Sequence, residues 1–351
     1  RMGPRLGYLS IFQPYGVRAR WWGEAGPWTI IQPAPGYEAW IETEKTRLLP
    51  EGTPLPGSLI DRLATVANDS TVRLDVATCE RLPFKVRVAD DLVSVHIVIF
   101  GATSNTDWIA QDPADDLIAK VSWSQTRPLV YEIDLELTRP VWGYDARYQN
   151  GTFVLEFKRP PEVKRGLTGL TIAVDAGHCA DKGAIGPTRY EEKDANLQIA
   201  HALRYFLERK GAEVVMTRWG DEDVPLYDRP AKAVAAGADL FISVHNNSVP
   251  NGVNPYIKNG TGTYYYHSVS RDLAREVQHW TLDASGLDDY GVTHGNFAVI
   301  RPTQYPSILV ECAFIIIPRQ EEMLRREEFA RRIARGITQG VQRFVHDRLE
   351  Q

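Results

Sequence analysis

The sequence predicts an α/β domain, with a mostly parallel twisted sheet and helices on both faces, preceded by one or two small all-β domains. Up to about residue 160, short apolar or alternating runs are separated by Gly, Pro, Asn and Asp, which is typical of strands joined by turns. Beyond residue 170, strand-like runs alternate with segments of helical periodicity, as in a parallel sheet covered by helices. A chain of 351 residues is also too long for one ordinary core.

The first part of the chain contains six strand-like runs, at residues 28–31, 71–76, 85–88, 92–100, 129–137 and 152–157. Pro-rich punctuation at 50–57 predicts a boundary between a first β domain, 1–57, and a second one, 58–160. The aromatic–turn–aromatic spacing of 28–31 and 38–41 resembles a bacterial SH3-like barrel. Trp142-Gly143-Tyr144-Asp145 and the run ending at Pro161 resemble a β-sandwich module found ahead of some cell-wall hydrolases.

The α/β domain is expected over residues 170–351, after a linker at 161–169; the stretch 158–169 has the composition of a linker, with two prolines, two glycines and four basic residues. Strands are expected at 170–174, 214–216, 240–244 and 308–310, and helices at 192–210, 226–236, 269–284 and 320–349. In the first helix, Leu197, Leu203 and Leu207 recur at helical spacing, and Gly211 suits its C-terminal end.

Composition and charge exclude several classes of protein. The formal net charge is −5, which gives no electrostatic footprint for nucleic acid. No apolar stretch approaches the roughly 18 residues that a membrane span needs, and no transmembrane segment is expected. The chain opens on Arg1-Met2-Gly3-Pro4, without a charged-then-apolar leader, so a signal peptide is expected to be absent from this sequence. Three widely spaced cysteines exclude a disulfide framework and a Cys-x-x-Cys zinc pattern.

Two histidines follow strand-like runs directly. His178 comes after the run at 170–174 through a tight Asp-Ala-Gly turn, and His245 comes after the run at 240–244. Because ligands bind at the carboxyl ends of the strands in open α/β sheets, the pair indicates a shared metal site. Two histidines and one carboxylate, with water in the fourth position, form a common catalytic zinc arrangement. Both Glu191 and Glu192, which open the first helix, are candidates for the carboxylate.

Glu311 lies in a third apolar run, between Val310 and Cys312. Burying an unpaired carboxylate costs several kcal/mol, so such a residue is expected to be paired, protonated or beside a polar cavity. A buried ion pair with a core arginine is one interpretation. The other is a general base that acts on water at the metal.

The order and spacing of these motifs resemble those of the zinc-dependent N-acetylmuramoyl-L-alanine amidases of bacterial cell walls, the Amidase_3 type. The matching stretches are 174–178, 192–197, 239–245, 262–266 and 306–311. The resemblance implies that His178, Glu192 and His245 hold one Zn²⁺ per chain and that Glu311 is the catalytic glutamate. It implies cleavage of the amide bond between N-acetylmuramic acid and the L-alanine of the stem peptide. It further implies an exported protein of the cell envelope, periplasmic or wall-associated, with peptidoglycan as its partner.

Other residues near these motifs have weaker assignments. Asn246 and Asn247 are expected to support the ligands or contact substrate, and Arg218 and Arg229 to bind substrate carboxylates or to tie the sheet together, the second role being favoured. Cys179 departs from the small residues that usually follow the first histidine in the amidase family. It is interpreted as a packing residue, because a fourth protein ligand would close the coordination position that hydrolysis needs open. Tyr256, Tyr264 and Tyr266 are expected in the core or along a glycan groove.

Alternative functions remain at this stage. A zinc peptidase or deacetylase acting on another bond of the wall would use the same residue types, and a wall-binding protein with a decayed site would keep only the fold. For residues 1–160, wall binding and a purely structural role are both compatible with the sequence. The stretch 248–262 is rich in Asn, Gly and Pro and has no helical periodicity, so the site is expected to be open rather than plugged by a helix.

Overall fold

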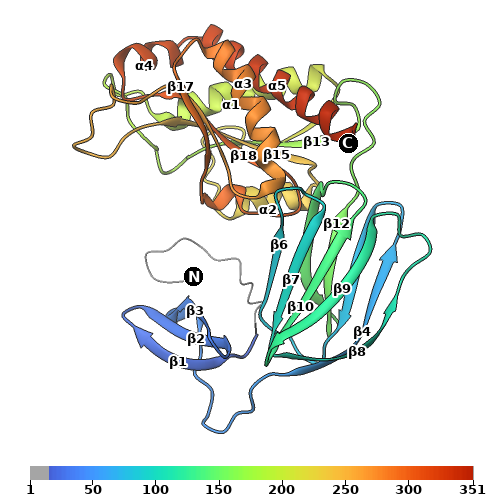
Figure 1. Cartoon of the computed structure of the whole chain (residues 1–351). Helices are drawn as coiled ribbons and strands as arrows, with labels where there is room; N and C mark the ends of the chain where they lie inside the picture. Colours follow the sequence, from blue (N-terminus) through green and yellow to red (C-terminus); the bar gives the residue numbers. More distant parts are fainter. Residues whose placement is uncertain (1–15, 351) are drawn as a thin grey trace. The chain divides into compact units, whose positions relative to one another are not determined.

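The computed structural model describes residues 16–350. The chain divides into two compact units, and the boundary in the sequence falls between Arg159 and Pro160 (Figure 1). Each unit has its own sheets and its own buried residues. Inside the first unit, one strand ends at Glu42 and the next begins at Ser58, and the Pro-rich stretch 50–57 lies between them; the domain boundary near residue 57 stays a prediction.

The first unit begins with a three-stranded antiparallel sheet. It consists of β1 (Arg20–Ala25), β2 (Trp28–Ala34) and β3 (Tyr37–Glu42), followed by a short 3₁₀ helix, η1 (Thr43–Lys45). Gly26 and Gly36 take positive φ angles at the two tight turns, which explains the Gly at each. The expectation of an SH3-like barrel for 1–57 stays a prediction, since the structure describes this three-stranded sheet and not residues 1–15.

Nine further strands of the first unit form two sheets. One has the order β6-β7-β10-β9, with β6 (Phe84–Val88), β7 (Ser94–Phe100), β10 (Val130–Leu137) and β9 (Ile118–Arg127). The other has the order β11-β12-β5-β4-β8, with β11 (Gly143–Gln149), β12 (Thr152–Lys158), β5 (Thr71–Ala77), β4 (Ser58–Ala67) and β8 (Ala102–Ala110). Phe84 of the first sheet meets Phe153 of the second edge to face, with ring centroids 4.8 Å apart, so aromatic packing joins the two sheets. Each of the six predicted runs overlaps a strand of this unit, although the runs at 92–100 and 129–137 start one or two residues before β7 and β10.

The second unit is built on a six-stranded sheet with the order β14-β13-β15-β18-β16-β17. Its strands are β14 (Glu213–Met216), β13 (Thr171–Ala176), β15 (Leu240–Asn247), β18 (Ser307–Phe314), β16 (Thr261–Tyr265) and β17 (Asp289–His294). Neighbouring strands are parallel except where β16 pairs antiparallel with β18. Every residue of β18 is buried, which explains why it reads as an uninterrupted apolar run around Glu311.

Helices cover both faces of this sheet (Figure 1). They are α1 (Glu192–Arg209), α2 (Asp228–Ala235), α3 (Arg271–Ser285), α4 (Pro318–Leu324) and α5 (Glu327–Leu349), with short 3₁₀ turns η2 (Ser268–Ser270) and η3 (Ala298–Ile300). The α1, α3 and α5 helices pack together along one face. On the other face, Ala233 of α2 and Ile300 of η3 share a buried cluster with Phe241 and Leu309 of the sheet. The prediction of a mostly parallel sheet with helices on both faces, preceded by all-β structure, is confirmed.

Two of the predicted helices differ in detail. The helix expected at 320–349 is two helices, because Arg326 takes an extended backbone with φ −90° and ψ 123°, and α5 begins afresh after it. The helix expected at 226–236 begins at Asp228 and ends at Ala235, with Pro230 in its first turn. Among the described residues, no helix is long and apolar enough to cross a membrane.

Candidate metal centre

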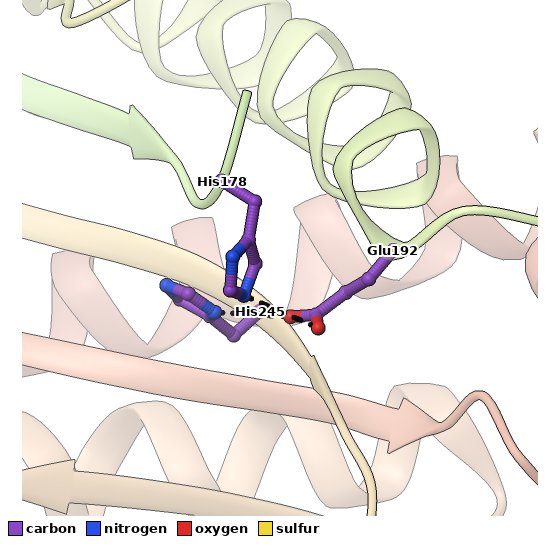
Figure 2. A group of neighbouring side chains, drawn as sticks. All are labelled: His178, Glu192 and His245. Atoms are coloured by element: carbon purple, nitrogen blue, oxygen red, sulfur yellow. Dashed lines mark hydrogen bonds and ion pairs between the residues drawn. The ribbon is translucent and has the colours of Figure 1, made fainter. Parts of the chain in front are cut away.

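Three predicted ligands meet at the carboxyl edge of the six-stranded sheet (Figure 2). His178 follows β13, His245 lies near the end of β15, and Glu192 is the first residue of α1. The Nε2 atom of His178 lies 3.2 Å from Oε2 of Glu192, and the Nδ1 atom of His245 lies 3.0 Å from Oε1. One donor atom from each of the three residues falls within 4.8 Å of the others, a separation that one metal ion can bridge.

Two glycines allow the chain to approach this centre. A Cβ atom on Gly177 would stand 2.2 Å from Nε2 of His245, so only glycine fits between His178 and that imidazole. Gly183 has a φ of +68°, and a Cβ there would stand 2.5 Å from Oε2 of Glu192. His178 itself takes a φ of +61°, a conformation that non-glycine residues adopt at a cost. The backbone is therefore shaped around the three ligands.

Glu192 is buried and strongly hydrogen-bonded in its charged form. Backbone N–H groups of Ala184 and Asn246 donate to its two oxygens, at 2.8 and 3.1 Å. Burial alone would raise the pKa of this carboxyl, but hydrogen bonds and charge from His178 and His245 outweigh it and hold the pKa well below its usual range. Glu191, the alternative candidate from the sequence, points elsewhere and pairs with Lys182 and Lys193.

Asp181 orients His178, and the sequence reasoning missed it. Its Oδ2 atom lies 2.7 Å from Nδ1 of His178, which leaves Nε2 directed at Glu192. A carboxylate on the far nitrogen of a metal-binding imidazole fixes both the tautomer and the ring. Burial lowers the pKa of His178, but Glu192 and Asp181 together raise it to about 9. An acid three residues after the histidine was the available signal in the sequence.

Glu311 lies beside this group of donors. In the parallel pairing of β15 and β18, Glu311 is the register partner of His245, and only 9% of the surface of Glu311 is exposed. No arginine pairs with it, and its Oε2 atom has no hydrogen-bond partner among residues 16–350. Burial raises the pKa of the carboxyl to about 7, although the charge of His245 acts in the opposite direction.

Two asparagines continue the network around Glu192. Asn246 donates through its side-chain amide to Oδ1 of Asn196 at 2.8 Å, and Asn196 donates to the carbonyl of Gly177 at 3.0 Å. Asn196 is fully buried one helical turn after Glu192, and sequence reasoning did not single it out, although its place on the inner face of α1 was a signal. Asn247 accepts the N–H of Ser248 and hydrogen-bonds the hydroxyl of Tyr264.

Three buried residues lie next to the loop that carries His178: Arg218, Arg229 and Cys179. Both guanidinium groups are buried, at 0% and 4% exposure, so neither offers a surface to substrate. Arg229 pairs with Asp175 at 2.9 Å and also donates to Sγ of Cys179. That thiol lies near Asp223 rather than among the metal ligands, as a packing residue would.

In the described part of the chain, no helix inserted after His245 covers the centre. Residues 248–260 form turns without helix, and the imidazoles of His178 and His245 keep 23% and 17% of their side-chain surface exposed. Tyr264 and Tyr266 are partly buried and pack against the cluster that contains Phe241 and Leu309, while Tyr256 is 66% exposed.

The donor set fits a zinc ion. Two imidazoles and one carboxylate are a common zinc set, His178 and Glu192 are each held by a further hydrogen bond from outside the set, and the orphaned Oε2 of Glu311 is close to His245. With an α/β sheet that brings such ligands and a basic carboxyl to one edge, the chain has the features of a metal-dependent hydrolase.

Comparisons with known proteins identify the family. A family model described as N-acetylmuramoyl-L-alanine amidase, Amidase_3, matches residues 172–343. Bacillus subtilis YqiI is 36% identical over 183 residues, which cover 51% of this chain and 86% of that protein. The chain therefore belongs to the Amidase_3 family of N-acetylmuramoyl-L-alanine amidases, and it is a hydrolase of the peptidoglycan-degrading class, as predicted.

Other relatives also match about half of the chain. The N-acetylmuramoyl-L-alanine amidase LytC of B. subtilis is 36% identical over 185 residues, and the probable cell wall amidase LytH of Staphylococcus aureus is 33% identical over 181 residues. Each match covers 51% of this chain, but only 36% of LytC and 59% of LytH. The crystal structure of an amidase from Clostridium difficile 630 is 34% identical, with a TM-score of 0.48, over 50% of this chain and 97% of that one.

Proposed function

We propose that this chain cleaves the amide bond between N-acetylmuramic acid and the L-alanine of the peptidoglycan stem peptide, with Glu311 as general base and then general acid. The observation that carries the proposal is the buried, unpartnered Oε2 of Glu311 next to His245. A carboxylate with no internal partner at that position needs a polar group to interact with, and an attacking water supplies one.

His178, Glu192 and His245 would hold one zinc ion in this proposal. When bound, zinc supplies a Lewis acid that lowers the pKa of water towards about 7 and polarises a carbonyl oxygen. The chain's own contribution is orientation: Asp181 fixes the ring of His178, and the N–H groups of Ala184 and Asn246 fix the carboxylate of Glu192.

Glu311 moves the proton. Burial raises the pKa of its carboxyl to about 7 in the metal-free site, and in this proposal the carboxylate takes a proton from water and returns it to the leaving amine of L-alanine. An ordinary glutamate, with a pKa of 4.5, would be a weaker base and would hold that proton less readily for delivery. Its buried position also shields the transferred proton from bulk water.

The four further residues take supporting roles in this proposal. Asn246 and Asn196 brace Glu192, and Arg218 and Arg229 support the backbone that carries His178. Asn247 lies at the end of β15, and we assign it to substrate contact together with the exposed Tyr256. Burial of both arginines favours the structural role for them over capture of substrate carboxylates.

The proposed substrate also indicates where the protein acts and what role its first unit has. We assign the protein to the cell envelope, on peptidoglycan, in keeping with relatives that are named cell wall amidases. Wall anchoring by the first unit is supported by Trp21 and Trp22 of β1, each 51% exposed, because consecutive exposed indoles are suited to stacking on sugar rings. The domain limits of 1–57 and 58–160, and the linker at 161–169, remain predictions.

Product analysis tests the proposed reaction. Zinc-loaded protein acting on purified peptidoglycan is expected to release intact stem peptides and to create new L-alanine amino termini, detected by amino-terminal labelling. A peptidase would create other amino termini, and a deacetylase would leave free amino sugars. The absence of new alanine termini from wild-type protein that contains zinc would overturn the proposal.

A further inference from the structure

The loop that carries His178 is held by two buried arginines from outside it. Three consecutive backbone carbonyls, those of Ala176, Gly177 and His178, each accept at least one guanidinium N–H. Arg218 donates to Ala176 at 2.8 Å and to Gly177 at 3.2 Å, while Arg229 donates to Ala176 at 2.7 Å and to His178 at 2.8 Å. Such a fork of fixed donors restrains the backbone at several points at once.

Arg218 reaches a second ligand segment as well. The same Nη2 atom that donates to the carbonyl of Gly177 donates to the carbonyl of Lys193 at 2.7 Å, and Lys193 directly follows Glu192 in the first turn of α1. Its Nη1 atom donates to Gly220, next to its own position after β14. One planar group therefore connects the backbone beside His178 to the backbone beside Glu192.

Two buried arginines are more than packing alone requires, because a buried guanidinium group must have its charge and its donors satisfied. Both are buried, yet among residues 16–350 the single carboxylate paired with them is Asp175, which also accepts from Thr217 and Ser243. Arg218 forms no ion pair with any residue that the structure describes, and its four donations all go to backbone carbonyls. Burying a guanidinium is costly unless its donors are satisfied, which these carbonyls achieve.

The conformation of His178 explains what this arrangement restrains. A φ of +61° is unfavourable for histidine, so without external restraint the loop would relax and move the imidazole. We propose that Arg218, with Arg229, is a positioning residue for the metal centre: it sets the separation of His178 and Glu192 before any metal binds. This inference rests on the proposed zinc site, and it adds a preformed geometry that the ligands alone do not provide.

The substitution Arg218→Lys tests the proposal, because a lysine keeps the charge but its single ammonium group cannot reach the four carbonyls that the planar guanidinium contacts. Zinc affinity is measured by competition with a chromophoric chelator on full-length protein. We expect it to fall by about 10- to 100-fold, the range found when groups that support metal ligands are lost. Arg348→Lys is the matched control, since Arg348 is another buried arginine of the same unit, on α5, and it pairs with Asp272. The control is expected to bind zinc within twofold of wild type.

The outcomes separate this inference from the proposed function. If wild type binds zinc and Arg218→Lys binds it equally well, the positioning role is wrong while the zinc site stands. If wild type binds no zinc, the proposed function fails first. Thermal unfolding of both variants identifies a general loss of stability, which would appear in the control as well.

A measurement on wild type needs no variant. In metal-free protein, the amides of Gly177 and Cys179, which donate to Val244 and Asp181, are expected to be as protected from hydrogen exchange as they are with zinc. Loss of this protection on adding a chelator would mean that the metal, and not the arginines, organises the loop. That result would overturn the proposal even if Arg218→Lys failed to fold.

Discussion

Glu311 stands directly opposite His245 in the pairing of β18 with β15, and its Oε2 atom has no partner among residues 16–350. This pairing places the carboxyl of Glu311 next to a predicted metal ligand. Because parallel pairing fixes the register, the neighbourhood of the two side chains is a property of the sheet and not of a mobile loop.

Glu311→Gln is expected to abolish catalysis while zinc binding is kept. The amide has nearly the same shape but cannot take a proton, so hydrolysis of purified peptidoglycan should fall by about 10²- to 10⁴-fold. Glu322→Gln, on the exposed surface of α4, is the control and should leave the rate unchanged. Substantial activity of the Glu311 variant would exclude this residue as the base.

The raised pKa of Glu311 predicts how the stability of the metal-free protein depends on pH. Since burial raises the pKa of Glu311 from 4.5 to about 7, the folded state binds this proton more tightly than the unfolded chain does. The contribution of this group to the free energy of unfolding should therefore fall as pH rises from about 4.5 to about 7, by up to roughly 3 kcal/mol. Denaturant unfolding in chelator should show this fall in wild type and not in Glu311→Gln; parallel pH profiles would contradict it.

Zinc binding is expected to release a proton. The pKa of His178 is about 9 in the metal-free site, so at pH 7 its imidazole is protonated and must lose a proton to become a ligand. The apparent affinity should increase about tenfold per pH unit up to pH 9, and calorimetry in buffers of different ionisation enthalpy should detect the released proton. An affinity that stays constant between pH 7 and pH 9 would be inconsistent with this site.

Gly177→Ala should disrupt the centre through steric contact alone. The added methyl group would meet Nε2 of His245 at 2.2 Å, so the imidazole or the loop must move. We expect zinc affinity to fall at least tenfold and stability to fall by about 1–3 kcal/mol. Gly23→Ala is the control, because nothing lies within 4 Å of the added atom there and its φ is not positive. Equal zinc affinity in both variants would refute the steric argument.

The sequence predicted which candidate ligands come together because strand ends can be read from apolar runs, and the carboxyl ends of parallel strands meet at one edge. His178 and His245 are of this kind. The choice of Glu192 over Glu191 was not available from periodicity, since both open the same helix, and it depended on the family resemblance. The structure separates them by the direction of the first turn, in which Glu192 faces the histidines and Glu191 faces two lysines.

The supporting residues were harder to predict because their roles depend on contacts between distant segments. Asp181 and Asn196 are ordinary polar residues in the sequence, and only the folded loop brings them to His178 and to Asn246. The break between α4 and α5 was missed for a related reason. Helical periodicity continues across Arg326, and the extended backbone there has no Gly or Pro to mark it.

The most direct test of the account is hydrolysis of purified peptidoglycan in ¹⁸O-labelled water, followed by mass spectrometry of the fragments. Cleavage of the amide to L-alanine should place one ¹⁸O atom in the lactyl carboxylate of N-acetylmuramic acid and leave the released stem peptide unlabelled. Label in a carboxylate of the peptide, or in released acetate, would instead identify a peptidase or a deacetylase and contradict the account.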